Sequence, residues 1–265
     1  MTHPSLSAYV LDVGGGSVFT RAGGGVPTIG SSAALGNPDG GDGMPIVMVH
    51  GAVISGRYMV PTARRLAVMH RVLIPDLPGF GASDDPAQPL DVPGLAGALH
   101  DWMAAAGIGR AHLLGNSMGA QVIADLAVRW PDAVASLVLV GPTVDRAART
   151  RMQQLWRLAH DAFLERPSLI PLHLRDIVRA GWRFATSALD IALDDRIEEK
   201  LAHVRAPVLI VCGDRDPLAP QAWCRWLGTQ SPTARLEILE GPHALNYSRP
   251  AELAECVERW IDELR

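Results

Sequence analysis

The stretch AHLLGNSMGAQVIADLAVRW, residues 111–130, decides the fold of this chain. It opens with a short apolar run, residues 111–114, which predicts a buried strand. After this run, apolar side chains recur at helical spacing from Met118 to Trp130. Ser117 therefore falls at a turn from a strand into a helix.

Two glycines flank this serine, two residues before it and two residues after it. Because a strand and a helix crowd together at such a turn, Gly115 and Gly119 provide the small residues that the packing needs. The turn would hold the Ser117 hydroxyl at the carboxyl-end edge of a sheet, beside a helix N-terminus that favours developing negative charge. This arrangement predicts a nucleophilic serine.

Strands and helices alternate along most of the chain. Strand-like runs lie at 9–13, 18–21, 45–49, 72–74, 111–114, 136–140, 207–211 and 235–239. Helix-like spacing occurs at 59–69, 95–106, 118–130, 222–227 and 251–264. The alternation predicts an α/β fold, with a mostly parallel, doubly wound central sheet of about eight strands. Residues 23–43, rich in glycine and small polar residues, are expected to form a surface loop.

One long stretch interrupts the strand series. Residues 143–203 contain no strand-like run, and three helices are expected there, at 152–163, 172–184 and 188–201. We therefore predict an inserted helical cap, residues 143–203, between two parts of one core domain, residues 1–142 and 204–265.

The amino-acid composition of the chain limits the kinds of molecule that it is expected to bind. The chain has 265 residues, 48% of them apolar, which is enough for one sizeable core with a small appended domain. The formal net charge is −4, and basic runs interleaved with aromatic residues are lacking, so a small molecule is a better candidate partner than a nucleic acid. No apolar run approaches the ~18 residues of a membrane span, and no secretion signal opens the chain.

The three cysteines give information about the cellular compartment of the protein and about metal binding. Cys212, Cys224 and Cys256 are odd in number and widely spaced, which suits reduced thiols and does not match metal-ligand spacing. We expect a cytoplasmic protein with a small-molecule substrate, no nucleic-acid or membrane partner, and no metal or other cofactor. The oligomeric state is left open.

Residues with catalytic chemistry follow three of the expected strands. Ser117, Asp216 and His243 come in the chain order of nucleophile, acid and base. A serine hydroxyl is too weakly acidic to attack on its own, so a histidine must take its proton and a carboxylate must orient that histidine. We expect activity to fall below about pH 6, where the imidazole of a base such as His243 becomes protonated.

A further strand end could complete the site. The sequence His50-Gly51-Ala52 follows the expected strand at 45–49 and could bring the backbone N–H of Ala52 near the serine. With the N–H of Met118, it would form a two-donor oxyanion hole, in which the loss of one donor typically costs roughly 3 kcal/mol of transition-state stabilisation.

Five motifs together carry a family resemblance. In order and spacing, the chain resembles the α/β-hydrolase fold family at HG (50–51), DLPGFG (76–81), GNSMG (115–119), GDRDP (213–217) and GPH (241–243). The resemblance covers nearly the whole chain from about Tyr9 onward. It implies Ser117 as nucleophile, His243 as base, an acid after the seventh core strand, and a helical lid between the sixth and seventh strands.

The same resemblance bears on which residue is the acid and on which residues support the site. It favours Asp216 as the acid, with Asp214 and Asp145 as the alternatives. It implies that Asp76 supports the site through packing, and His50 is expected to hold the loop after its strand in shape.

Pocket residues are expected beside the serine and in the cap. We predict that the substrate pocket is lined by Asn116, Met152, Trp156, Trp182 and Ala244. Specificity would reside in the cap, so the substrate itself is left open.

The resemblance implies a serine hydrolase that cleaves an ester-like bond of a small, largely apolar substrate through an acyl-enzyme, as a carboxylic ester hydrolase does. The wording of residues 115–119 is also similar to that of carbon-carbon bond hydrolases of aromatic ring-fission products, although Ala244 replaces the tryptophan that usually follows their histidine. A small-molecule binding or receptor protein with a vestigial triad is the non-enzymatic alternative.

Overall fold

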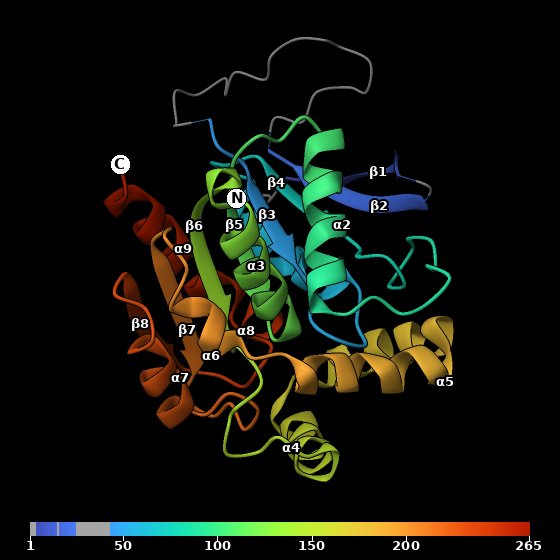
Figure 1. The fold of residues 1–265 in the computed structure, drawn as a ribbon, viewed down its shortest axis with the longest axis vertical. Helices are drawn as coiled ribbons and strands as arrows, with labels where there is room; N and C mark the ends of the chain where they lie inside the picture. The colour runs from blue at the N-terminus through green and yellow to red at the C-terminus, as the bar shows by residue number, and fades with distance from the viewer. Residues whose placement is uncertain (1–3, 15, 25–42) are drawn as a thin grey trace.

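The computed structural model describes residues 4–14, 16–24 and 43–265, without the side chains of residues 180–186. The loop expected at 23–43 lies almost entirely outside these residues. Figure 1 shows a twisted central sheet with helices on both sides.

The sheet has eight strands in the order β1-β2-β4-β3-β5-β6-β7-β8. Their bounds are β1 Ser7–Val13, β2 Gly16–Gly23, β3 Ile46–Val49, β4 Val72–Pro75, β5 Ala111–Asn116, β6 Val134–Val140, β7 Val208–Gly213 and β8 Ala234–Leu239. The first two strands form an antiparallel hairpin and β2 pairs antiparallel with β4, whereas all strands from β4 to β8 pair in parallel. The prediction of a mostly parallel sheet of about eight strands is confirmed.

The inner parallel strands are largely apolar because both of their faces are covered, whereas β8, at the edge of the sheet, carries Arg235 and Glu237. In β3, Val47 and Val49 belong to one hydrophobic cluster, and Ile46 and Met48 belong to a second cluster on the opposite face. This alternation follows from the two-residue period of a strand. It explains why the sequence shows a continuous apolar run rather than alternating polar and apolar residues.

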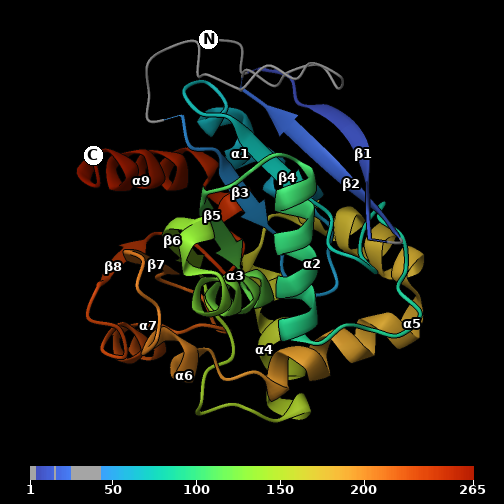
Figure 2. The ribbon, with the colours of Figure 1, turned by 45° about the horizontal axis from the view of Figure 1, so that its top comes forward.

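The helices have the bounds α1 Val60–Leu66, α2 Val92–Ala105, α3 Met118–Arg129, α4 Arg151–Leu164, α5 Ile170–Asp194, α6 Ile197–Leu201, α7 Gln221–Gly228, α8 Leu245–Ser248 and α9 Pro250–Glu263. Short 3-10 helices in the described part of the chain are η1 Gly56–Met59, η2 Pro131–Ala133 and η3 Pro167–Leu169. Helices α2, α3 and α7 contribute to the first cluster, and α1, α8 and α9 to the second, so the sheet is covered on both faces. Figure 2 shows α2 and α3 side by side on one of these faces.

Helices α4, α5 and α6 are inserted between β6 and β7. Figure 1 shows α4 and α5 beyond the edge of the sheet toward which the parallel strands point. The sequence predicts separate helices at 172–184 and 188–201, but the backbone continues as one helix from Ile170 to Asp194. Alanine, threonine and serine at 185–187 cost at most a few tenths of a kcal/mol each in a helix, so they do not end it.

Candidate active site

Ser117 lies at a strained turn between β5 and α3. Its backbone has φ 58° and ψ −123°, a conformation that costs a non-glycine residue on the order of 1–3 kcal/mol and must be held by its surroundings. The N–H of Ser117 donates to the carbonyl of Val140 at 3.0 Å, which ties the turn to the end of β6. The side chain is half-buried.

The two flanking glycines are required by close backbone contacts. A Cβ on Gly115 would lie 2.4 Å from the carbonyl oxygen of Gly119, and a Cβ on Gly119 would lie 2.3 Å from the carbonyl oxygen of Val49. Both distances are far below van der Waals contact. The crowding that the sequence predicts at this turn is therefore present.

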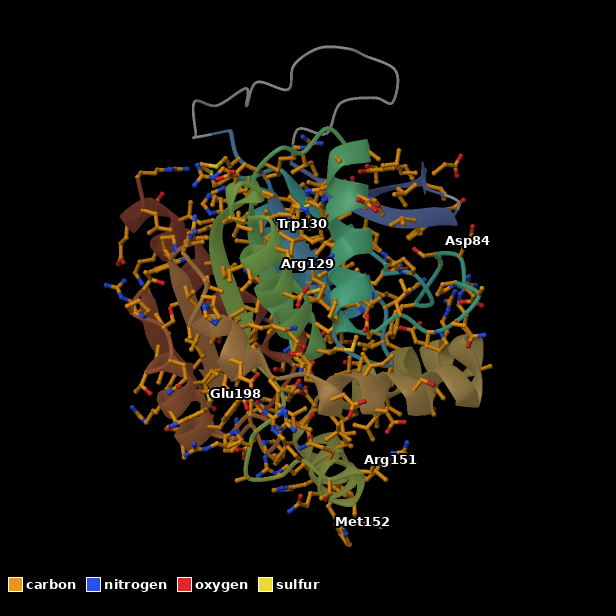
Figure 3. The ribbon with its side chains drawn as sticks, viewed as in Figure 1. Asp84, Arg129, Trp130, Arg151, Met152 and Glu198 are labelled. Carbon is orange, nitrogen blue, oxygen red and sulfur yellow. The ribbon has the colours of Figure 1, made fainter. Side chains whose placement is uncertain are left out.

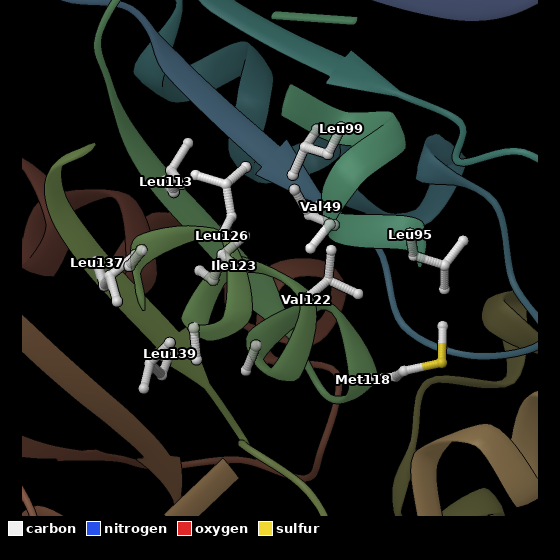
Figure 4. Packing of buried hydrophobic residues seen from close by; sticks show 14 of the residues in the cluster. Val49, Leu95, Leu99, Leu113, Met118, Val122, Ile123, Leu126, Leu137 and Leu139 are labelled. Carbon is white, nitrogen blue, oxygen red and sulfur yellow. The ribbon is translucent and has the colours of Figure 1, made fainter. Parts of the chain in front are cut away.

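Helix α3 is fixed by buried packing along its length. Figure 4 shows its apolar side chains against those of α2 and of the sheet, among them Met118, Val122, Ile123, Leu126, Leu95, Leu99 and Leu139. This packing holds the start of α3 against the sheet, and so it stabilises the position of the serine.

Asp216 and His243 contact each other at the same edge of the sheet. The Nδ1–H of His243 donates to Oδ2 of Asp216 at 2.8 Å. The other oxygen of Asp216 accepts the N–H groups of Leu218 and Ala219 at 2.8 and 2.9 Å, so the carboxylate is fixed in orientation. Because Nδ1 is the donor, Nε2 is the ring nitrogen that can accept a proton.

The two alternative acids have other partners. Asp214 accepts the N–H of Gly241 at 2.8 Å, and Asp145 pairs with Arg157 at 2.8 Å. The structure thus places Asp216, rather than either alternative, against His243.

Burial and charge act on His243 in opposite directions. Burial alone lowers the pKa of its imidazole, but Asp216, together with Asp161 and Glu165, outweighs this effect and raises the pKa to about 9. Stabilisation of an imidazolium is what a base needs after it has taken the proton of a serine.

The loop after β6 contributes two residues that sequence reasoning missed. A Cβ on Gly141 would lie 2.9 Å from both Asp216 Oδ2 and His243 Nδ1, so a glycine lets the acid and the base approach this loop. Two residues later, Thr143 Oγ1 lies 3.5 Å from Ser117 Oγ. The sequence did carry a signal, because both residues lie within three positions of the end of a parallel strand, where functional residues gather.

The loop after β3 approaches the serine. A Cβ on Gly51 would lie 3.0 Å from the Cβ of Ser117, and the Gly51 N–H donates to the Tyr58 hydroxyl at 2.9 Å. Ala52, one of the two predicted oxyanion donors, follows in this loop, and the other, Met118, is fully buried at the start of α3.

His50 holds this loop in shape. Its Nδ1 lies 2.8 Å from the carbonyl of Gly51, and its Nε2 accepts the N–H of Leu77 at 2.9 Å. Burial lowers the pKa of His50, so its ring is neutral and both ring nitrogens serve the backbone. Asp76 acts similarly, because its carboxylate accepts from Arg21 and from the backbone N–H groups of Gly56 and Ala82.

Two of the predicted pocket residues, Asn116 and Ala244, are buried in the protein. Asn116 is buried, donates to the carbonyls of Val140 and His243, and accepts from the Tyr58 hydroxyl at 2.6 Å. Its amide is therefore already engaged by the protein. Ala244 is buried in the second hydrophobic cluster.

The predicted pocket residues of α4 lie on its outer side. Met152 is 65% exposed and Trp156 is 73% exposed, and Figure 3 shows Met152 pointing away from the rest of the molecule. The buried residues of α4 are instead Gln154 and Asp161, so this helix turns polar side chains inward. The fifth predicted pocket residue, Trp182, is among the side chains that the structure does not describe.

In the parts of the chain that the structure describes, no three His, Cys, Asp or Glu side chains are grouped as metal ligands would be. Across the same residues, no helix is both long and apolar enough to cross a membrane.

Several known proteins similar to this chain are named as esterases or hydrolases. Residues 46–256 match the model of the Alpha/beta hydrolase family. A pimeloyl-[acyl-carrier protein] methyl ester esterase of Xanthomonas campestris is 29% identical in an alignment 252 positions long, and the match covers 84% of this chain and 97% of that protein. A 2-hydroxy-6-oxo-6-phenylhexa-2,4-dienoate hydrolase of Burkholderia cepacia is 26% identical, over 76% of this chain and 81% of that protein.

A solved structure supports the fold alone. The enol-lactonase of Burkholderia xenovorans superposes with a TM-score of 0.78 at 20% identity, over 96% of this chain and 100% of that one. Its likeness therefore concerns the arrangement of the strands and helices.

Proposed function

Because the chain belongs to the alpha/beta hydrolase family, we propose that it is a serine hydrolase that cleaves an ester-like bond of a small, largely apolar substrate. The observation that carries this proposal is the bond between His243 and Asp216 at the sheet edge that also holds the strained turn of Ser117. A methyl ester esterase among its relatives supports the ester as the bond.

In this proposal, His243 Nε2 takes the proton of Ser117 as the hydroxyl oxygen attacks the ester carbonyl. Asp216 keeps the ring in the tautomer with Nδ1–H and stabilises the imidazolium that forms. The negative charge that develops on the carbonyl oxygen is bound by the backbone N–H groups of Ala52 and Met118.

Collapse of this intermediate expels the alcohol, which leaves with the proton held by His243. Ser117 then carries the acyl group as an ester. A water molecule, deprotonated by the same imidazole, attacks this acyl-enzyme and releases the acid, and the proton returns to the serine.

We assign the substrate roof to the inserted segment, residues 143–203, which we name the cap segment. Its helices lie beyond the carboxyl-end edge of the sheet, where parallel α/β sheets bind ligands. A cytoplasmic location is part of this proposal and is supported by the free, buried state of all three cysteines.

The second candidate function is hydrolysis of a carbon-carbon bond in an aromatic ring-fission product. A relative named for such a dienoate substrate favours it. Ala244 at the position after the histidine weakens it.

A labelling experiment tests the nucleophile. A fluorescent serine-directed phosphonate should label the wild-type protein, and Ser117→Ala should lose both the label and at least about 10³-fold in hydrolysis of p-nitrophenyl esters. Thr143→Ser, which keeps a hydroxyl beside Ser117, is the matched control and should still be labelled. Label that persists in Ser117→Ala would refute the assignment.

A substrate screen separates the candidate functions. We expect turnover of p-nitrophenyl esters across a series of rising acyl length, and little turnover of a vinylogous 1,5-diketone. Faster turnover of the diketone would favour the carbon-carbon hydrolase. Tight ligand binding without turnover of either class would indicate a binding protein.

A further inference from the structure

Two carboxylates of the cap segment contact the loop that carries His243. Asp161 and Glu165 lie one turn apart at the end of α4 and are both buried, with 8% and 9% of their surface exposed. Asp161 Oδ1 accepts the backbone N–H of His243 at 3.2 Å, and Glu165 Oε1 accepts that of Ala244 at 2.5 Å. The cap segment is therefore bonded directly to the backbone of the proposed base.

These carboxylates lack a permanent positive partner among the described side chains. Arg157, one turn before Asp161 on α4, pairs with Asp145 instead. The second oxygen of Glu165, Oε2, is buried without a hydrogen-bond partner. A buried carboxylate without a cation is costly, so the imidazolium of His243 is the charge that can balance this pair.

The pKa values reflect the same arrangement. Burial, with Asp161 as a further cause, raises the pKa of Glu165 to about 7. Burial also raises the pKa of Asp161, although His243 opposes this effect. In return, the two carboxylates add to the influence of Asp216 in raising the pKa of His243.

Charged and titratable groups face His243 from three elements. They are Asp216 after β7, Asp161 and Glu165 at the end of α4, and His173 on α5. Burial lowers the pKa of His173, so this ring adds little positive charge at neutral pH. The surroundings of the base are therefore negative, and α4 supplies two of the three carboxylates.

We propose that Asp161 and Glu165 are positioning residues that set the proton affinity of His243, and that they couple the seating of α4 to the action of the base. The coupling rests on the proposed function. A base can take the proton of Ser117 only while it is neutral, so activity rises as pH increases through the pKa of His243. With α4 seated, the rise in activity lies above the ordinary imidazole value of about 6.5, and so above the pH of about 6 expected from the sequence, because the carboxylates around His243 raise its pKa. Neutralising Glu165 or withdrawing α4 moves this rise in activity to lower pH.

The test measures the titration of His243 directly. Glu165→Gln and Asp161→Asn keep an acceptor oxygen for the backbone N–H groups and remove only the charge. Glu255→Gln, on the exposed face of α9, is the control for loss of a carboxylate elsewhere. The imidazole signals of the full-length proteins are followed by NMR from pH 5 to 10, with the His243 signal assigned by its absence in His243→Gln.

We expect each of the two cap variants to lower the pKa of His243 by about half a unit or more, and the control to leave it unchanged. The acid limb of kcat/KM should move to lower pH by the same amount, which a purely structural role would not cause. A His243 pKa within about 0.2 unit of wild type in both cap variants would overturn the inference. Since this titration needs no substrate, failure of the proposed function would appear separately, as hydrolysis that survives Ser117→Ala.

Discussion

Asp214 and Asp216 stand two residues apart after β7 and have different partners. Asp216 binds the His243 ring, and Asp214 binds the backbone N–H of Gly241. Parallel strands end at one edge of the sheet, so the sequence alone could bring the serine, an acid and the histidine together. The family resemblance favours Asp216 over Asp214, and the structure adds the direction of each carboxylate.

At the scale of the residue, the assignment of Asp216 as the acid can be tested by replacing its carboxylate with an amide. Asp216→Asn should lower kcat by about 10³- to 10⁴-fold, because an amide cannot stabilise the imidazolium and favours the wrong tautomer. Asp214→Asn should lower kcat less than about tenfold, because its oxygen can still accept from Gly241. The measurement is steady-state hydrolysis of a p-nitrophenyl ester by both variants, and equal losses would contradict the assignment.

At the scale of the element, the contact between α3 and β3 depends on Gly119. Gly119→Ala should lower the free energy of unfolding by about 1–3 kcal/mol, because the new Cβ would overlap the carbonyl of Val49. Gly97→Ala in α2 is the matched control, since a Cβ there meets its nearest atom only at 3.9 Å. It should stabilise the protein by up to about 1 kcal/mol. Urea unfolding of both variants checks the prediction. If Gly119→Ala were as stable as the wild type, the prediction would be wrong.

Elements of the core were more predictable than those of the cap segment. Buried parallel strands appear as continuous apolar runs, so β3, β5, β6 and β7 could be found from the sequence. The helical period of α4 can also be recognised in the sequence. A period shows which residues share a face of the helix, but it does not show which face packs against the rest of the protein. Met152 and Trp156 on the apolar face of α4 are predicted to line a pocket. In the structure, Asp161 lies on the face of α4 that packs against the protein. Its bond to His243 joins residues 82 positions apart, and no local pattern encodes such a contact.

At the scale of the whole molecule, most of the exposed large apolar side chains among the described residues lie in the cap segment. Phe163 is 88% exposed, and Leu155, Leu174 and Val178 are exposed as well. The exposed charged residues described between positions 151 and 179 are arginines, while the acids there are buried. Surface of this kind binds hydrophobic probes.

Replacing Trp156 and Phe163 together by serine should therefore reduce the fluorescence of the bound dye ANS. The free energy of unfolding should change by no more than about 1 kcal/mol, since two surface substitutions remove little buried area. Leu99→Ala in the core, by comparison, should cost about 2–5 kcal/mol. Dye titration and urea unfolding provide the two measurements. A double variant as unstable as the core variant would show that these side chains are packed.

The insertion point between β6 and β7 also has a consequence for the divergence and engineering of this scaffold. A segment that enters and leaves at one edge of a sheet can be exchanged without rebuilding the strands beneath it. Here, however, acids of that segment are bonded to the core: Asp176 holds the N–H and the hydroxyl of Ser55, and Asp161 and Glu165 hold the backbone at His243 and Ala244. A chimaera that receives a foreign cap without these acids would keep Ser117, Asp216 and His243 but lose two carboxylates beside the imidazole, and its pH optimum should move to lower pH.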